Sequence, residues 1–220
     1  MKMLVSDYDN TFSVDIKNNI NSVQNFMKNN IFVIATGRSF IDFKKVEEKY
    51  NIKYNYLIID HGATIVYDDE IIYTKCIDND VLKNLINLLN NNIVFLCSGL
   101  KKTNILENVT KINVHYDDIE TSKKINDFLN TNYKDYINSY LINPYTIEIT
   151  SNLASKKIAI DYLNNLLNID SIYTIGDSYS DIDMIKSYNG FAMKDCVDEL
   201  NKIKKVSSVS EVINLIENDF

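Results

Sequence analysis

The first residues of this chain that could do chemistry are two carboxylates close to its N-terminal end. Asp7 and Asp9 follow the apolar run 3–5, and the hydroxyl of Thr11 comes two positions later. On a loop that leaves a buried strand, this layout suits attack on phosphorus, with one carboxylate as nucleophile and the next as proton donor. Acidic residues after a strand are equally common as solvated loop residues, so the motif alone leaves both interpretations open.

Two further positions could bind an anion. Thr36 and Gly37 follow the apolar run 31–35, where a hydroxyl and exposed backbone amides near a helix start suit a phosphate. Lys156 opens a later helical segment and could reach the same phosphate as a point charge. Taken singly, a turn glycine, a solvent-facing Arg38 and a solvated surface lysine are the more ordinary explanations.

Another pair of acids lies at the start of a helical segment. Asp177 and Asp181 follow an apolar run that ends at Ile175, with the turn residue Gly176 before them and Ser180 between them. Asp181 could act only as a helix N-cap. Two carboxylates at this spacing also suit the oxygen ligands that Mg²⁺ prefers, and here the functional interpretation is favoured.

The segments around these motifs predict an α/β fold. Short apolar runs alternate with helical patterns over the first 60 residues and again after residue 156, which is the order of a parallel sheet with crossover helices. Ligands bind at the carboxyl ends of strands in such a sheet, so the motifs could converge there. The predicted strands of this sheet are 2–6, 31–35, 56–59, 171–175, 190–193 and 204–206.

The middle of the chain follows a different pattern. After a hairpin expected at 64–75, short strands and two helices alternate irregularly, as in a small α+β unit. The predicted organisation is therefore a catalytic core of residues 1–78 and 152–220, with an inserted domain of residues 79–151.

Composition excludes several classes of function. The net charge of −7 argues against a nucleic-acid binder that relies on a basic surface. No apolar run approaches the roughly 18 residues of a membrane span, and no signal-peptide pattern is present. The three cysteines are widely spaced, so reduced thiols in a cytoplasmic protein are expected. We therefore expect no nucleic-acid and no membrane partner, whereas a small anionic substrate remains possible.

In this order, the motifs resemble those of the haloacid dehalogenase-like phosphohydrolases. The closest likeness is to the Cof-like branch, in which a type IIB-like cap is inserted between the second and third motifs, and the stretch 190–195 also looks like that branch. The likeness covers essentially the whole chain. It implies a Rossmann-like core, Mg²⁺ as cofactor and an aspartyl-phosphate intermediate.

The resemblance also implies a role for each motif residue. Some would react, some would hold the phosphoryl group and others would hold the metal. Asp7 is the nucleophile and a metal ligand, Asp9 is the general acid and base and adds its carbonyl oxygen to the metal, Thr36, Gly37 and Lys156 bind the phosphoryl group, Asp177 binds Mg²⁺, and Asp181 and Ser180 support the metal site. Charge balance agrees, because one lysine cannot offset these carboxylates together with a phosphate.

Three positions depart from the family pattern. Ser180 replaces the usual Asn, which predicts a weaker metal site. Lys157 replaces a common Gly, which raises the question of which lysine points inward; Lys156 is favoured. His61 lies in the turn after the third strand, where Asn-Gly is usual. It could contact a substrate or be a loop residue without a task, and the second is favoured.

Three functions remain open. The leading one is a Mg²⁺-dependent phosphatase that acts on a small phosphorylated metabolite, of which sugar phosphates are the family's usual choice. A phosphotransferase or phosphomutase shares the Asp-x-Asp-x-Thr motif, and a catalytically weak regulatory binding protein could retain the fold. The cap is expected to select the substrate, with Asn143, Tyr145 and Thr146 as candidate contacts. Oligomeric state is not predicted.

Overall fold

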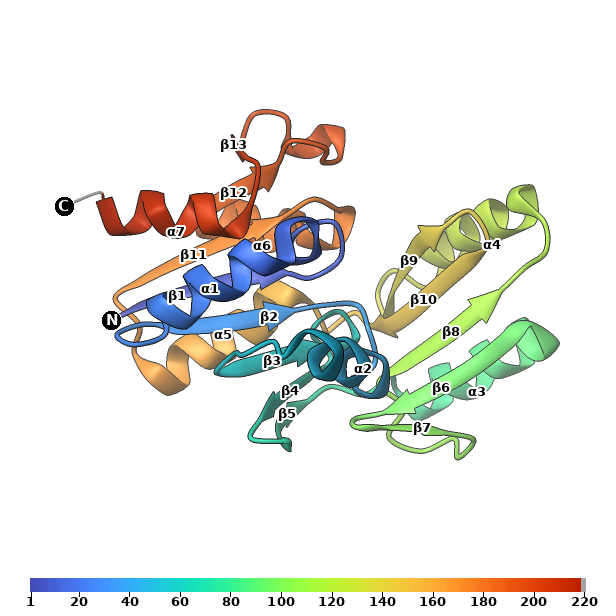
Figure 1. Ribbon diagram of the computed structural model, residues 1–220. Coiled ribbons are helices and arrows are strands. Elements are labelled where there is room, and N and C mark those ends of the chain that lie inside the picture. The colour runs from blue at the N-terminus through green and yellow to red at the C-terminus, as the bar shows by residue number, and fades with distance from the viewer. Residues whose placement is uncertain (219–220) are drawn as a thin grey trace.

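The computed structural model describes residues 1–218 and contains two sheets, the larger on the left of Figure 1 and the smaller on the right. The strand order is β13-β12-β11-β1-β2-β3-β4-β5 in the larger sheet and β7-β6-β8-β10-β9 in the smaller. Every strand of the smaller sheet falls within residues 79–151, and every strand of the larger falls outside that range. We therefore propose the division of the chain at these bounds and call the two parts the core and the cap.

The core sheet is parallel in its centre. Strands β13 to β3 pair in parallel, whereas β4 and β5 extend the sheet as an antiparallel hairpin. All residues of β2 are buried, as expected for a strand that is covered on both faces. The strands are β1 (Lys2–Asp7), β2 (Ile31–Ala35), β3 (Tyr56–Ile59), β4 (Thr64–Tyr67), β5 (Glu70–Thr74), β11 (Ser171–Gly176), β12 (Asn189–Met193) and β13 (Lys204–Val206).

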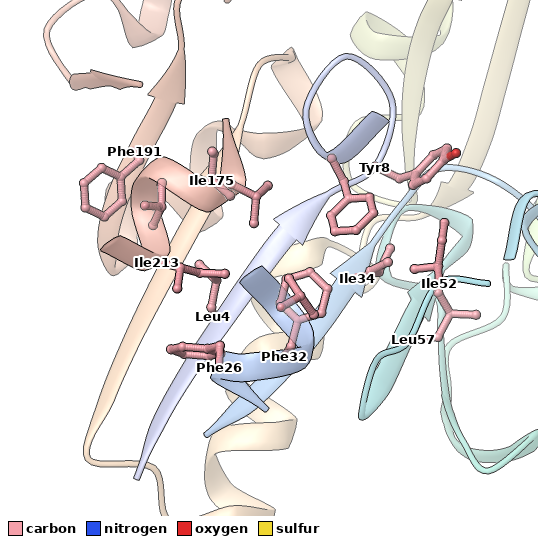
Figure 2. Close-up of a cluster of buried hydrophobic side chains, with 14 of the residues drawn as sticks. Leu4, Tyr8, Phe26, Phe32, Ile34, Ile52, Leu57, Ile175, Phe191 and Ile213 are labelled. Atoms are coloured by element: carbon pink, nitrogen blue, oxygen red, sulfur yellow. The ribbon is translucent and has the colours of Figure 1, made fainter. Parts of the chain in front are cut away.

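Helices cover both faces of this sheet because side chains alternate along each strand. Leu4 of β1 packs with Phe26 and Ile213 on the face of α1 and α7, as Figure 2 shows. Val5, the next residue, packs with Ile160 on the opposite face, beneath α5 and α6. The core helices are α1 (Ile16–Phe26), α2 (Phe40–Tyr50), α5 (Lys156–Leu167), α6 (Ile182–Ser187) and α7 (Val209–Asn218), with short 3₁₀ turns at η1 (Phe12–Asp15), η2 (Asp60–Gly62), η4 (Tyr179–Asp181) and η5 (Asp198–Leu200).

The cap sheet has one apolar and one polar face. In β8, Ile112 and Val114 pack into an apolar cluster with α3 and α4, whereas Lys111 and Asn113 alternate with them and face the other way. The helices therefore cover one face, and the other, polar face carries no helix, although Lys111 and Asn113 on it are buried. The cap elements are α3 (Asn79–Leu89), η3 (Asn90–Asn92), β6 (Ile93–Ser98), β7 (Lys101–Thr103), β8 (Lys111–His115), α4 (Ile119–Asn132), β9 (Ile137–Asn143) and β10 (Thr146–Ser151).

The predicted α/β class, with a parallel sheet and an inserted α+β unit, is confirmed. Two details differ. The sequence pattern also indicates a helix near 197–201, but this segment forms only the three-residue turn η5. The edge strand β7 is not among the predicted elements, because its sequence Lys-Lys-Thr has no apolar alternation. Within residues 1–218, no helix combines the length and apolar character that a membrane crossing requires.

Candidate active site

The motif residues meet at one edge of the core sheet. Strand β1 lies between β2 and β11 and runs parallel to both, so the loops that follow these three strands open on the same side. Asp7 ends β1, Thr36 follows β2, Asp177 follows β11 and Lys156 begins α5. A pocket of about 1050 Å³ lies over this edge, and residues of both the core and the cap line it.

Three buried carboxylates lie close together at this edge, and two of them share one ammonium group. One oxygen from each of Asp7, Asp177 and Asp181 can be chosen so that all lie within 4.8 Å of one another. Lys156 Nζ donates to Asp7 Oδ1 and to Asp181 Oδ1, both at 2.6 Å. Burial raises the pKa of Asp7 well above its usual range; Lys156 opposes this shift, whereas Asp181 and Asp177 add to it. The cluster therefore carries more negative charge than its lysine offsets.

This donor set fits Mg²⁺. The ion prefers oxygen ligands and usually binds through one or two carboxylates. The second oxygen of Asp7, Oδ2, accepts no hydrogen bond from any residue between 1 and 218, so it is available to a ligand. Burial and the charge of Asp181 raise the pKa of Asp177, which a cation would reverse. Asp7 and Asp177 are the residues that would hold the ion.

Asp181 has a different position from the other two acids. Its Oδ2 accepts from the backbone N–H of Asp177 at 3.2 Å, from the N–H of Ser178 at 3.0 Å and from the Ser178 hydroxyl at 2.7 Å. Its other oxygen accepts from Lys156. Both oxygens are thus engaged, which suits a residue that orients the Asp177 loop and Lys156.

The structure shows where the two residues that depart from the family motifs, Lys157 and Ser180, direct their side chains. Ser155 caps α5 by accepting from the N–H of Ile158 at 3.1 Å, and the following Lys156 turns inward with a side chain only 1% exposed. Lys157 instead pairs with Asp161 at the surface. Ser180 lines the pocket, but its hydroxyl contacts the Ser178 hydroxyl at 3.0 Å and none of the three carboxylates.

Arg38 is a pocket residue that the sequence interpretation treated as solvent-facing. Its Nε and Nη2 donate to Asp9 Oδ2 and Oδ1 at 2.8 and 2.6 Å, and the guanidinium lies 5.2 Å from the Tyr8 ring centroid. This planar, two-bond arrangement is the one that arginine favours with a carboxylate. Arg38 therefore holds Asp9 in this conformation. The sequence feature that could have identified Arg38 as a pocket residue is its position directly after Thr36 and Gly37.

The expected cap contacts are wrong. Asn143, Tyr145 and Thr146 do not line the pocket, because they lie in or next to the exposed turn between β9 and β10. The cap residues that do line it include the cross-strand row Asn113–Glu148–Tyr140, whose members are paired in β8, β10 and β9. The polar alternation of β8 carried the signal for this face, but the strand register that completes the row was needed as well.

His61 has a packed position, so the expectation of a loop residue without a task is also wrong. Its side chain is buried, with Nε2 at 2.7 Å from Glu148 Oε2 and the ring stacked at 4.3 Å on Tyr140 of the cap. The next residue, Gly62, has a φ of +102°, and a Cβ there would lie 2.2 Å from the backbone of Ser155. Turn η2 therefore packs against the cap on one side and against the start of α5 on the other.

The same imidazole explains why residue 37 is glycine. A Cβ on Gly37 would lie 2.4 Å from His61 Cε1, and contacts with Glu148 and Tyr140 keep the ring from moving. We expect Gly37→Ala to lower the free energy of unfolding by about 1–3 kcal/mol, measured by denaturant titration. The double variant Gly37→Ala/His61→Ala should lose less stability than the two single changes added together. Simple additivity would contradict this contact.

Comparisons with known proteins agree with this geometry. A family model described as haloacid dehalogenase-like hydrolase matches residues 4–105 and 97–212. A Mycoplasma genitalium protein named as a candidate phosphatase is 23% identical, in an alignment that covers 84% of this chain and 82% of the relative. A haloacid dehalogenase-like hydrolase of B. subtilis has a TM-score of 0.81 at 17% identity over 100% of both chains. The sucrose-phosphatase of Synechocystis, solved with sucrose and phosphate, has a TM-score of 0.71 at 17% identity, over 98% of this chain and 96% of its own. At these identities the two solved structures show a common fold.

Proposed function

The chain belongs to the haloacid dehalogenase-like hydrolase family, and we propose that it is a Mg²⁺-dependent phosphatase of small phosphorylated metabolites. The observation that carries the proposal is the buried cluster of Asp7, Asp177 and Asp181 around one lysine, at the carboxyl ends of parallel strands. The relative named as a candidate phosphatase and the sucrose-phosphatase of the same fold support it.

The phosphoryl group would lie against the open oxygen of Asp7. Lys156 would contact it as a point charge, and Thr36 would donate its hydroxyl proton. Thr36 Oγ1 accepts from the N–H of Arg38 at 3.1 Å and donates to no residue between 1 and 218, so its proton is available. Asp7 and Asp177 would hold Mg²⁺, whose charge would offset that of the phosphoryl oxygens and of the two carboxylates.

The proposed reaction has two displacements at phosphorus. An Asp7 oxygen attacks, the bond from phosphorus to the substrate oxygen breaks, and that oxygen takes a proton from Asp9 as the alcohol leaves. Asp9, now a carboxylate, removes a proton from water, whose oxygen attacks phosphorus and releases inorganic phosphate and free Asp7. Because Arg38 donates to both oxygens of Asp9 in the structure, that ion pair must open before Asp9 can carry the proton.

The experiment is hydrolysis of a chromogenic phosphate monoester, followed by a panel of phosphorylated sugars and cofactors. We expect release of inorganic phosphate without any added acceptor, loss of activity with a chelator, and recovery with Mg²⁺. Turnover only in the presence of a second alcohol would favour a phosphotransferase. No turnover of any panel member, with Mg²⁺ present and the protein folded, would exclude the phosphatase.

A further inference from the structure

A buried lysine of the cap reaches the loop of residues 36–38 in the core. Lys111, on β8, has a side chain that is 1% exposed. Its Nζ donates to the carbonyl oxygen of Gly37 at 2.5 Å and to Glu148 Oε1 at 3.0 Å, and it lies 3.3 Å from Asp60 Oδ1. The ammonium is therefore surrounded by three oxygens, one of which belongs to the backbone beside Thr36.

The charged forms of Lys111 and Glu148 are favoured despite burial, whereas burial raises the pKa of Asp60. Burial alone would lower the pKa of Lys111, but the carboxylates of Glu148 and Asp60 outweigh it and raise that pKa. Burial alone would raise the pKa of Glu148, but Lys111 and His61 outweigh it and lower that pKa to about 2. A buried ammonium is costly unless it is paired and hydrogen-bonded. Lys111 thus depends on each of the oxygens around it.

These oxygens come from both parts of the chain. Glu148 belongs to the cap strand β10, whereas Gly37 and Asp60 belong to the core. The Thr110 hydroxyl, next to Lys111, also donates to Asp60 Oδ2 at 2.9 Å. The surroundings of Lys111 are complete only when the cap lies against the core.

The peptide group that contains the Gly37 carbonyl is hydrogen-bonded to the Thr36 side chain. It belongs to the peptide whose N–H, on Arg38, donates to Thr36 Oγ1 at 3.1 Å. An ammonium on that carbonyl fixes the peptide plane and strengthens its N–H as a donor. Turn η2 holds the two ends of the loop, because His61 N–H donates to the Thr36 carbonyl and Asp60 N–H to the Arg38 carbonyl, both at 3.1 Å. The peptide between them is the one that Lys111 holds.

We propose that Lys111 is a positioning residue, which orients the Gly37–Arg38 peptide and so aims the Thr36 hydroxyl at the phosphoryl group only when the cap is seated. This inference rests on the proposed function, since it assigns phosphate binding to Thr36. It makes phosphate affinity in the core depend on a residue of the cap that does not itself touch phosphate.

The test compares Lys111→Met with Lys102→Met. Lys102 is a matched control, because it pairs a cap strand with Asp42 of the core at 3.0 Å and makes no contact with the 36–38 loop. The double variant Lys111→Met/Glu148→Gln reduces the unpaired charge, in case the single variant does not fold. The measurements are the affinity for inorganic phosphate with Mg²⁺ by calorimetry, kcat and KM separately, and hydrogen exchange of the Arg38 amide.

We expect both Lys111 variants to weaken phosphate binding about tenfold or more, to raise KM and to speed exchange of the Arg38 amide, whereas Lys102→Met changes phosphate affinity less than about twofold. If the Lys111 and Lys102 variants weakened phosphate binding equally, Lys111 would only hold the cap on the core, and the proposal would be overturned. Unchanged Arg38 exchange in both Lys111 variants would overturn it as well. If the unmodified protein neither binds phosphate nor hydrolyses esters, the proposed function fails, and the exchange comparison still tests the hold of Lys111 on the loop.

Discussion

Asp7→Asn is expected to lower kcat on the order of 10⁴-fold or more while the protein keeps or gains stability. An amide oxygen is a poor nucleophile and cannot carry the phosphoryl group. The substitution keeps the size of the side chain and an oxygen that can accept from Lys156. It also removes one of three crowded negative charges, and because burial raises the pKa of Asp7, the ionised form is costly in the folded protein. Activity and stability should therefore change independently.

Three measurements test this prediction. Release of inorganic phosphate gives kcat, thermal unfolding gives stability, and mass spectrometry of acid-quenched protein detects a covalent phosphoryl group in the unmodified chain and none in the variant. Asp195→Asn serves as control, since Asp195 is exposed and does not line the pocket. Turnover of Asp7→Asn at the rate of the control would exclude covalent catalysis through Asp7.

Lys156→Met is expected to cost about 3–5 kcal/mol of unfolding free energy and to remove phosphate binding. The change leaves the carboxylates of Asp7 and Asp181 buried without their ammonium. Lys156 normally lowers the pKa of Asp7, so that pKa rises further above its unfolded value in the variant. When the pKa of a carboxyl is higher in the folded than in the unfolded protein, the free energy of unfolding falls as the pH rises toward the folded-state pKa. The deficit against the unmodified protein should therefore shrink as the pH is lowered.

The neighbouring lysine supplies a matched control. Lys157→Met removes the surface pair with Asp161, which is worth about 0.3–0.5 kcal/mol for this helix spacing. Denaturant titrations at several pH values, with and without Mg²⁺, give the comparison. Mg²⁺ should restore part of the stability of Lys156→Met, because a cation bound by Asp7 and Asp177 would offset the same negative charge. A similar loss in both variants would contradict the central position of Lys156.

Much of the fold and the outline of the site follow from local patterns in the sequence. The strands β1, β2 and β11 are short apolar runs, and their order with the helices predicts a parallel sheet. Once the strands are parallel, residues directly after them must share one edge, which is why Asp7, Thr36 and Asp177 could be grouped without a structure.

The contacts between distant segments required the tertiary structure. Arg38 and Asp9 are 29 residues apart, Lys111 and Gly37 are 74 apart, and His61 and Glu148 are 87 apart. Nothing local says which way Arg38 turns, or that His61 meets the cap. In the cap, the polar alternation of β8 predicts a polar face, but a shift of register by one residue would turn a neighbouring strand's side chains to the other face. The sequence by itself thus determined which residues stand at the ends of the core strands. Tertiary packing decided their partners, within the core for Arg38 and Asp9 and between cap and core for Lys111 and Gly37. That packing depends on register and orientation between segments far apart in the chain.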